Sequence, residues 1–297
     1  MAVDPLIHVI ILTWNRLQDT LACLESLLAT EYSNLRIVLV DNGSSDDTPA
    51  IVRTTFPTVT VVENGRNLGF AAGTNVGIRY ALADETDFVF LLNNDTLVDR
   101  SLFQHLLGVI EPGVGMVAPK IYYADDPNRI WSVGAMKHPL TLERSGDGRN
   151  QLDAGQWDLV LDRDYLVGCA LLISRQLLEE IGLFDEAFFV YYEDSDLTLR
   201  AREGGYRLLL APQAKIWHRV SASSGGSDTP NERYWMAHSS VRFFCKHTRG
   251  WHWMIVVPFR MGSALKLTLR LLSRGNVTAT TAYWRGLLDG LQAVARR

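Results

Sequence analysis

Short apolar runs alternate with helical stretches through the first hundred residues. The runs lie at 8–12, 35–40, 59–62 and 88–92. The helices predicted between them span 17–28, 47–55 and 71–82. Strands joined by helices of this length form right-handed βαβ units, and their parallel sheet is buried on both faces. The pattern therefore predicts an α/β fold with a mostly parallel, Rossmann-like sheet flanked by helices.

Each of three predicted strands is followed at once by a polar cluster. The clusters are Thr13–Arg16, Asp41–Ser45 and Asn93–Thr96. The carboxyl ends of parallel strands lie at one edge of a sheet, and ligands bind beyond that edge. We therefore expect the three clusters to line one rim.

The second half of the chain is less regular. Residues 124–160 are predicted to form loops or a hairpin, with a strand at 167–174 and a helix at 175–181. Two further strands are predicted at 207–210 and 215–218, and 221–230 is rich in Ser and Gly. By composition this last segment is a flexible loop that closes over a ligand as a lid.

An acidic cluster follows an aromatic run at 188–192. Glu193, Asp194 and Asp196 open a predicted helix that ends at Gly204-Gly205. One interpretation is structural, because acids complement the dipole of a helix N-terminus, and Asp196 can pair with Arg200 one turn later. The other is catalytic, because a positioned carboxylate can take a proton from a substrate.

Cysteine usage and charge narrow the class of protein. Cys23, Cys169 and Cys245 are far apart and form no CxxC pair, so neither a disulfide framework nor a zinc site is expected. No basic segment precedes the first apolar run, so a signal peptide is not expected. We expect a cytoplasmic protein.

The C-terminal region is strongly basic. From residue 242 onward it holds ten Lys or Arg and one acid, a net charge of +9, whereas the 19 basic and 32 acidic residues before it give −13. A helix over 262–274 carries Lys266, Arg270 and Arg274 in one stripe beside leucines. With Trp251 and Trp253 nearby, 251–274 is typical of a helix lying on the inner face of an anionic membrane. Packing on the body or at a homodimer interface is the alternative. We expect no nucleic-acid partner.

Six motifs occur in an order that resembles family-2 glycosyltransferases of the rhamnosyltransferase-like branch. They are TWNR at 13–16, DNGSSDD at 41–47, NLGFAAGTNVGI at 67–78, LLNNDT at 91–96, VGCALLISR at 167–175 and the stretch beginning YYEDSD at 191. The resemblance covers about residues 6–225. It implies a GT-A fold over 1–228, with a nucleotide-sugar half to about 120 and an acceptor half over 121–228. Residues 229–297 then form a helical C-terminal appendage.

The resemblance implies a nucleotide-sugar donor and assigns residues to it. Asp41 resembles the acid that holds the base or ribose, with Thr13, Asn15 and Arg16 lining the base pocket. An Asx-turn at Asp41 and a helix N-cap at Thr13 or Asn15 are structural alternatives.

A second donor segment opens the helix after residue 69. Gly69, Phe70, Gly73 and Asn75 allow a phosphate to approach the helix N-terminus, or the helix to pack closely on the sheet. The chain lacks both GxGxxG after its first strand and GxxxxGK[ST], which disfavours a dehydrogenase, a methyltransferase or a P-loop kinase.

Asn93-Asn94-Asp95 occupies the position of the family's metal-binding DxD motif. Only Asp95 is a carboxylate, so the resemblance implies a Mn²⁺ or Mg²⁺ site with one negative charge fewer than usual, in which Asn93 and Asn94 face the donor. His218 resembles a histidine that contacts metal or diphosphate in relatives, and imidazole favours manganese. A structural histidine at a strand end is the alternative.

Asp194 matches the family's general base, and Glu193 its orienting neighbour. Gly168, Cys169 and Ala170 are expected beneath the acceptor, with packing as the alternative. The predicted reaction is inverting transfer from dTDP-rhamnose or a UDP-hexose to a hydroxyl of a polysaccharide or lipid-linked glycan. A sugar-nucleotide nucleotidyltransferase and a catalytically silent homologue are the alternative functions.

Overall fold

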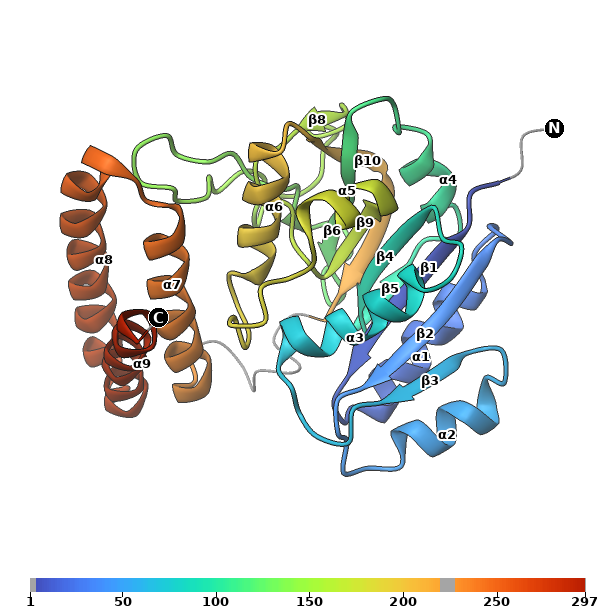
Figure 1. The fold of residues 1–297 in the computed structure, drawn as a ribbon, viewed down its shortest axis with the longest axis horizontal. Helices are drawn as coiled ribbons and strands as arrows, with labels where there is room; N and C mark the ends of the chain where they lie inside the picture. The colour runs from blue at the N-terminus through green and yellow to red at the C-terminus, as the bar shows by residue number, and fades with distance from the viewer. Residues whose placement is uncertain (1–3, 220–227, 297) are drawn as a thin grey trace. The chain divides into compact units, whose positions relative to one another are not determined.

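The computed structural model describes residues 4–219 and 228–296, which divide into two compact units (Figure 1). The sheet unit comprises Met1–Met136, Gly146–Glu186 and Asp194–Val220. The helical unit comprises Lys137–Ser145, Ala187–Glu193 and Ser221–Arg297. The two units are described separately. The division into donor and acceptor halves near residue 120 stays a prediction.

The sheet unit is built on one mixed sheet with the strand order β3-β2-β1-β4-β9-β6-β10-β5. Strands β3, β2, β1 and β4 are parallel, as predicted. Strand β9 then runs antiparallel to both β4 and β6, β10 is parallel to β6, and β5 is antiparallel to β10. The strands are β1 (Ile7–Thr13), β2 (Leu35–Asp41), β3 (Thr60–Glu63), β4 (Phe88–Asn93), β5 (Thr96–Val98), β6 (Val114–Tyr123), β7 (Ile130–Ser132), β8 (Leu161–Asp162), β9 (Ala170–Ser174) and β10 (Arg207–His218).

Helices cover both faces of this sheet. Side chains along a strand alternate between the two faces, and apolar side chains of the strands are buried on each face. Ile7, Val9 and Ile11 of β1 pack with α1 (Leu17–Leu28), α2 (Thr48–Thr55) and α4 (Leu102–Leu107). Ile10 and Val38 pack on the other face with α3 (Phe70–Leu82), α5 (Arg175–Ile181) and α6 (Glu193–Glu203). The result is a helix–sheet–helix sandwich.

The sequence predictions are most accurate in the parallel part of the sheet. Three differences appear beyond it. The two strands predicted at 207–210 and 215–218 are one strand, β10, interrupted by a register shift after Ala211. Strand β9 begins at Ala170, three residues later than predicted. Strands β5 and β6 and helix α4 were not predicted, and most of the predicted lid at 221–230 lies outside the described residues.

The helical unit contains α7 (Pro230–His247), α8 (Trp253–Ser273) and α9 (Val277–Ala295). Helices α7 and α9 approach closely at glycines: a side chain at Gly290 would meet the His238 carbonyl oxygen at 2.8 Å. The Tyr234 hydroxyl donates to Asp289 across the same contact, at 2.9 Å. Helix α8 begins about nine residues before the predicted 262–274 helix and contains Pro258. Within the described residues, none of the helices has the length and apolar character needed to cross a membrane.

Candidate active site

The strand register brings the predicted polar clusters to one rim. Thr13 lies beside Asp41 across β1 and β2, and Leu12 lies beside Asn93 across β1 and β4. On the next strand, Ala170 pairs with Leu92. The ends of four neighbouring strands therefore carry the residues that the sequence places in donor, metal and acceptor binding.

Asp41 is held by the turn that follows it. Its carboxylate is buried and accepts hydrogen bonds from the backbone N–H of Gly43 and Ser44, both at 3.1 Å, which is the Asx-turn of the structural alternative. Asn15 joins the same turn: its N–H donates to Ser44 Oγ at 2.7 Å, and its Oδ1 accepts from Ser45 N–H at 2.8 Å. Sequence reasoning missed Ser44 as the link between the two loops.

The predicted helix N-cap at Thr13 or Asn15 is wrong. The N-cap of α1 is Arg16, which makes no side-chain capping bond. Asn15 and Arg16 both adopt left-handed backbone conformations, with φ of 59° and 67°. The Thr13 hydroxyl instead lies 3.0 Å from the Thr20 hydroxyl. The Arg16 side chain is 44% exposed at the rim, and its Nη1 lies 3.8 Å from Asp19 Oδ2.

The start of α3 is shaped by packing. Gly69 caps the helix with φ 84°, a conformation that favours glycine. A side chain at Gly73 would meet Leu12 at 2.8 Å and Asn42 at 3.1 Å, so this glycine allows the close helix–sheet contact. Phe70 is partly exposed, and its ring lies edge-on to Phe184.

Asn75 is engaged within the protein. Its amide nitrogen donates to the Phe184 carbonyl at 2.9 Å and to Glu186 at 3.0 Å, and its oxygen accepts from Phe184 N–H at 3.1 Å. These bonds give Asn75 a structural function, and its contact with a donor stays a prediction.

Asn42 is a site-building residue that the sequence reasoning treated only as part of a turn. Its amide donates to Asn67 and to the Gly69 carbonyl, and its oxygen accepts from Leu68 N–H at 3.0 Å. These bonds fasten the loop before α3 to the end of β2. Its position between Asp41 and Gly43, at the end of a predicted strand, could have indicated that it belongs to the site.

The two predicted metal ligands lie together. Asp95 Oδ1 is 3.1 Å from His218 Nε2, and both side chains are buried. The pairing of β5 with β10, which sets Thr96 beside His218, brings them together. The Trp131 ring packs against the imidazole at 4.7 Å between centroids. Among the described residues, no group of three or more acidic, His or Cys side chains is placed to hold a metal without further ligands.

Asn93 and Asn94 form hydrogen bonds with different neighbours, Asn94 through its side chain and Asn93 through its backbone. Asn94 donates to the hydroxyls of Thr13 at 3.2 Å and Thr20 at 3.0 Å, which ties it to the nucleotide side of the rim. The Asn93 N–H donates to the Cys169 carbonyl at 2.8 Å, which ties β4 to the segment before β9.

Asp194 lies in the first turn of α6 and is 8% exposed. Its carboxylate accepts from Ser195 N–H at 2.6 Å and from Gly168 N–H at 3.3 Å. A side chain at Gly168 would meet the Asp194 Cβ at 3.3 Å, so glycine lets the acid approach this backbone. Asp196 pairs with Arg200 at 2.9 Å, which confirms its predicted structural pairing.

The two residues before Glu193 are half-buried and have strained backbones. Tyr191 and Tyr192 adopt left-handed backbone conformations, with φ of 67° and 68°. Burial, followed by the charges of Glu232 and Glu193, raises the pKa of Tyr191 to about 12. Glu193 is 7% exposed. Strain of this kind persists where surrounding contacts fix a conformation, as at many active sites.

Cys169 lies between Gly168, whose N–H donates to Asp194, and Ala170, the first residue of β9. Burial raises the pKa of its thiol well above the ordinary range, and the charges of Asp95 and then Asp194 raise it further. Both carboxylates are thus close enough to act on one side chain. A thiol so strongly held in its neutral form is a packing group rather than a nucleophile.

Comparisons with known proteins agree with this arrangement. The family model "Glycosyl transferase family 2" matches residues 8–182. An N-acetylglucosaminyl-diphospho-decaprenol L-rhamnosyltransferase of Mycobacterium tuberculosis is 27% identical over 89% of this chain and 91% of its own length. The dTDP-rhamnosyl transferase RfbF of Shigella flexneri is 21% identical over 73% and 70%. The chain spans only 26% of a third relative, the uncharacterized protein y4gI of Sinorhizobium fredii, at 29% identity.

The fold is that of solved glycosyltransferases. The mannosyltransferase PcManGT of Pyrobaculum calidifontis, determined with GDP-mannose and Mn²⁺, superposes with a TM-score of 0.59 at 19% identity, over 99% of this chain and 79% of that one. The family match covers more than half of the chain and includes strands β1, β2, β4 and β9. The chain therefore belongs to glycosyl transferase family 2 and is a glycosyltransferase with a GT-A fold.

Proposed function

We propose that this enzyme transfers a sugar from a nucleotide diphosphate to an acceptor hydroxyl with inversion, and that Asp194 is the general base. The observation that carries the proposal is that the segment before β9 contacts both acidic motifs. Gly168 N–H donates to Asp194 at 3.3 Å, and the next carbonyl, that of Cys169, accepts from the N–H of Asn93, two residues before Asp95, at 2.8 Å. Inverting transfer needs a base on the acceptor side and charge neutralisation on the leaving diphosphate. In this proposal Asp194 supplies the base, and Asp95 helps to hold the cation that neutralises the diphosphate.

Asp194 suits the acceptor side. Backbone N–H groups of Gly168 and Ser195 orient its carboxylate. In the proposed reaction it takes the proton of the acceptor hydroxyl while that oxygen attacks the anomeric carbon, and the bond to the nucleotide diphosphate breaks on the opposite face. Gly168, Cys169 and Ala170 form the floor beside it, and Glu193 orients the preceding turn.

Asp95 and His218 fit a divalent cation that takes its remaining ligands from the diphosphate and water. One carboxylate and one imidazole are too few alone, but Mg²⁺ and Mn²⁺ sites on phosphates commonly use few protein ligands. The buried His218 Nδ1 has no hydrogen-bond partner among the described residues. When bound, the ion would neutralise charge on the leaving diphosphate. Asn93 and Asn94 then face the donor with neutral side chains.

In this proposal the base and ribose of the donor are surrounded by four residues of the nucleotide side: Thr13, Asn15, Arg16 and Asp41. The other edge of the donor is lined by residues at the start of α3: Gly69, Phe70, Gly73 and Asn75. The names of the two rhamnosyltransferase relatives favour dTDP-rhamnose as donor, with a UDP-hexose as the alternative. The name of the mycobacterial relative describes a lipid-linked acceptor, which favours a lipid-linked glycan here.

The test is turnover of dTDP-rhamnose and UDP-hexoses with Mg²⁺ or Mn²⁺, comparing wild type with Asp194→Asn. We expect the variant to lose about 10²–10⁴-fold in kcat while it binds dTDP as before, since a general base contributes that much. Glu203→Gln, an exposed acid at the far end of α6, is the matched control. Near-wild-type turnover by folded Asp194→Asn would contradict the assignment.

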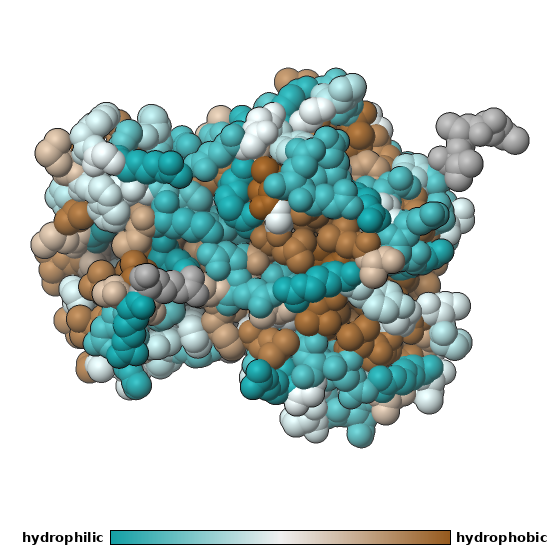
Figure 2. All heavy atoms as spheres, in the orientation of Figure 1, coloured by the Kyte–Doolittle hydropathy of each residue, from teal (hydrophilic) through white to brown (hydrophobic). Residues whose placement is uncertain are grey.

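We also propose that the helical unit contacts an anionic membrane surface. Its apolar face comprises Met254, Val257, Met261, Leu265, Leu269 and Leu272 of α8, with Trp284, Leu288 and Leu291 of α9. These side chains recur every three or four residues, so each set lies along one side of its helix. Met254 is 74% exposed and Met261 is 68% exposed. Figure 2 shows apolar residues at the surface over α8, interspersed with polar ones.

The charge around the apolar face favours lipid over a second copy of the chain. Arg270 and Arg274 pair with Asp228 at 2.8 and 3.2 Å, whereas Lys266 is exposed. The region from residue 242 keeps a net charge of +9. Two such surfaces would repel each other across a dimer, whereas anionic lipid headgroups attract them. A lipid-linked acceptor would be presented at the same surface.

A further inference from the structure

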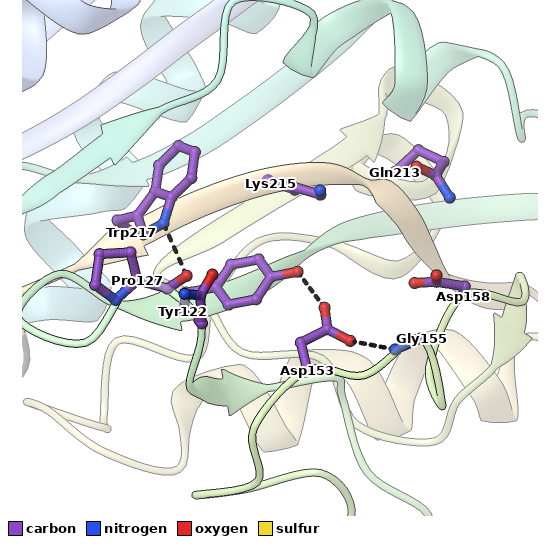
Figure 3. Close-up of a pocket in the computed structure, with 9 residues that line it drawn as sticks. Tyr122, Pro127, Asp153, Gly155, Asp158, Gln213, Lys215 and Trp217 are labelled. Atoms are coloured by element: carbon purple, nitrogen blue, oxygen red, sulfur yellow. Dashed lines mark hydrogen bonds between the residues drawn. The ribbon is translucent and has the colours of Figure 1, made fainter.

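The sheet unit contains a groove whose lining includes none of the residues proposed above for donor, metal or acceptor binding. It encloses about 320 Å³ between β10 and the loop at 150–158, which covers the end of β6. Gln213, Lys215 and Trp217 of β10 line one side, and Asp153 and Asp158 of the loop line the other (Figure 3). We call this cavity the β10 groove.

Two aromatic rings form the floor of the β10 groove near its rim end. Tyr122 and Trp217 stack with centroids 6.2 Å apart and an interplanar angle of 25°. Trp217 stays partly exposed, and its indole N–H donates to the Pro127 carbonyl at 3.3 Å. The Tyr122 hydroxyl donates to Asp153 at 2.5 Å. Both rings are therefore fixed before any ligand arrives.

The charges of the groove balance. Lys120 is fully buried beneath it and donates to Asp153 at 2.9 Å and to Asp158 at 2.6 Å. Lys215 adds a second cation to these two carboxylates. The two carboxylates are offset by the buried Lys120 beneath them and by Lys215 in the wall, so a charged ligand gains little. The polar groups suit a neutral ligand with many hydroxyls.

A fixed aromatic floor with hydrogen-bonding walls is the chemistry that recognises a sugar ring. The C–H groups on one face of a sugar carry partial positive charge and pack on the negative face of an aromatic ring. The hydroxyls around the ring can bond to Asp158, whose side chain is 52% exposed, and to the exposed amide of Gln213. Pockets with apolar floors and a few placed polar groups are typical of small-molecule sites.

The groove begins beside the catalytic rim. Trp217 immediately precedes His218, the partner of Asp95, and the two side chains point to opposite faces of the strand. Trp217 and Gln213 lie at opposite ends of the β10 groove, with Lys215 between them (Figure 3). We propose that the β10 groove binds a neutral sugar residue of the acceptor glycan, away from the hydroxyl that reacts. This inference rests on the proposed transferase function.

The test uses the full chain and four neutral trisaccharides: cellotriose, chitotriose, maltotriose and mannotriose. Saturation-transfer NMR at millimolar sugar should detect binding of at least one of them to wild type. Trp217→Ala and Gln213→Ala should each reduce that signal at least several-fold. Gln213 is exposed, so its variant remains informative even if Trp217→Ala does not fold. Gln104→Ala, an exposed glutamine on α4, is the matched control.

Two results would overturn the proposal: no binding of any trisaccharide by wild type, or equal binding by wild type and the folded Gln213→Ala variant. Hydrolysis of the nucleotide-sugar donor separates this failure from failure of the transferase function. If the groove proposal alone is wrong, wild type still releases nucleotide from its donor in an Asp194-dependent way. If the function is wrong, it does not.

Discussion

Single side chains at the rim differ in what holds them. Asp194 is held by backbone N–H groups, whereas Asp95 lies against the imidazole of His218. The sequence predicted both acids from their motifs. It did not show that Asp95 and His218 touch, because they are far apart in the chain and meet only through the pairing of β5 with β10.

Removing either partner of the Asp95–His218 pair should weaken metal binding without unfolding the chain. We expect Asp95→Asn and His218→Asn to raise the Mn²⁺ concentration for half-maximal turnover by at least about ten-fold, because each removes a ligand. Asp125→Asn, an exposed acid on a nearby loop, should leave that concentration unchanged. An unaltered Mn²⁺ requirement in both variants, measured by activity titration, would show that the pair is structural.

At the scale of elements, the parallel strands β1 to β4 were predictable, and strand β6, which lies beneath the β10 groove, was not. Apolar runs such as 35–40 become β2 with little change at their ends. Strand β6 contains Pro119 and Lys120, which interrupt the apolar pattern, yet Lys120 is fully buried. Only its two partners at 153 and 158, on a loop, make that burial favourable. A local pattern cannot show partners so distant in sequence.

Helix α3 should tolerate no side chain at Gly77. An added Cβ there would overlap Ile10 and lie 2.9 Å from Val40, both on the sheet beneath. We expect Gly77→Ala to reduce the free energy of unfolding by about 1–3 kcal/mol through overpacking, even though alanine favours helix. Gly262→Ala on α8 has no neighbour within 4 Å and should be neutral or stabilising. Urea unfolding compares the two, and equal stabilities would refute this packing argument.

The loop at 150–158 should loosen in acid. Burial tends to raise the pKa of Asp153, but hydrogen bonds from Lys120 and Tyr122 outweigh it and lower the pKa below the ordinary 3.8. A carboxyl with a depressed folded-state pKa stabilises the fold above its unfolded pKa, and that contribution is lost as pH falls through the folded pKa. The protection of the loop amides against hydrogen exchange, measured relative to the intrinsic exchange rate at each pH, should therefore decrease below about pH 4. Asp153→Asn should show fast exchange already at neutral pH. Slow exchange in that variant would contradict the prediction.

At the scale of the whole molecule, the two units were predictable to different extents. The sheet unit follows from strand spacing and ordered motifs. In the helical unit a helix over 262–274 and its basic stripe were predicted, but the side of α8 that packs inward was not. The helix is apolar on two sides: Val256, Ala264 and Leu271 are buried, while Met254 and Met261 are exposed. A sequence with apolar residues nearly all round does not show which side packs inward. Membrane binding therefore needs a direct measurement.

Wild-type protein should co-sediment with vesicles of phosphatidylglycerol and phosphatidylcholine, and less with phosphatidylcholine alone. Leu265→Ser combined with Leu269→Ser should weaken binding about a hundred-fold, since each buried leucine contributes about 1.5 kcal/mol or more. Leu159→Ser, at a leucine 75% exposed in the sheet unit, is the matched control. Raised salt should weaken binding further, because headgroup attraction is screened. If the protein ignores both vesicles and sediments as a dimer that the double variant dissociates, a second copy of the chain covers the apolar face instead.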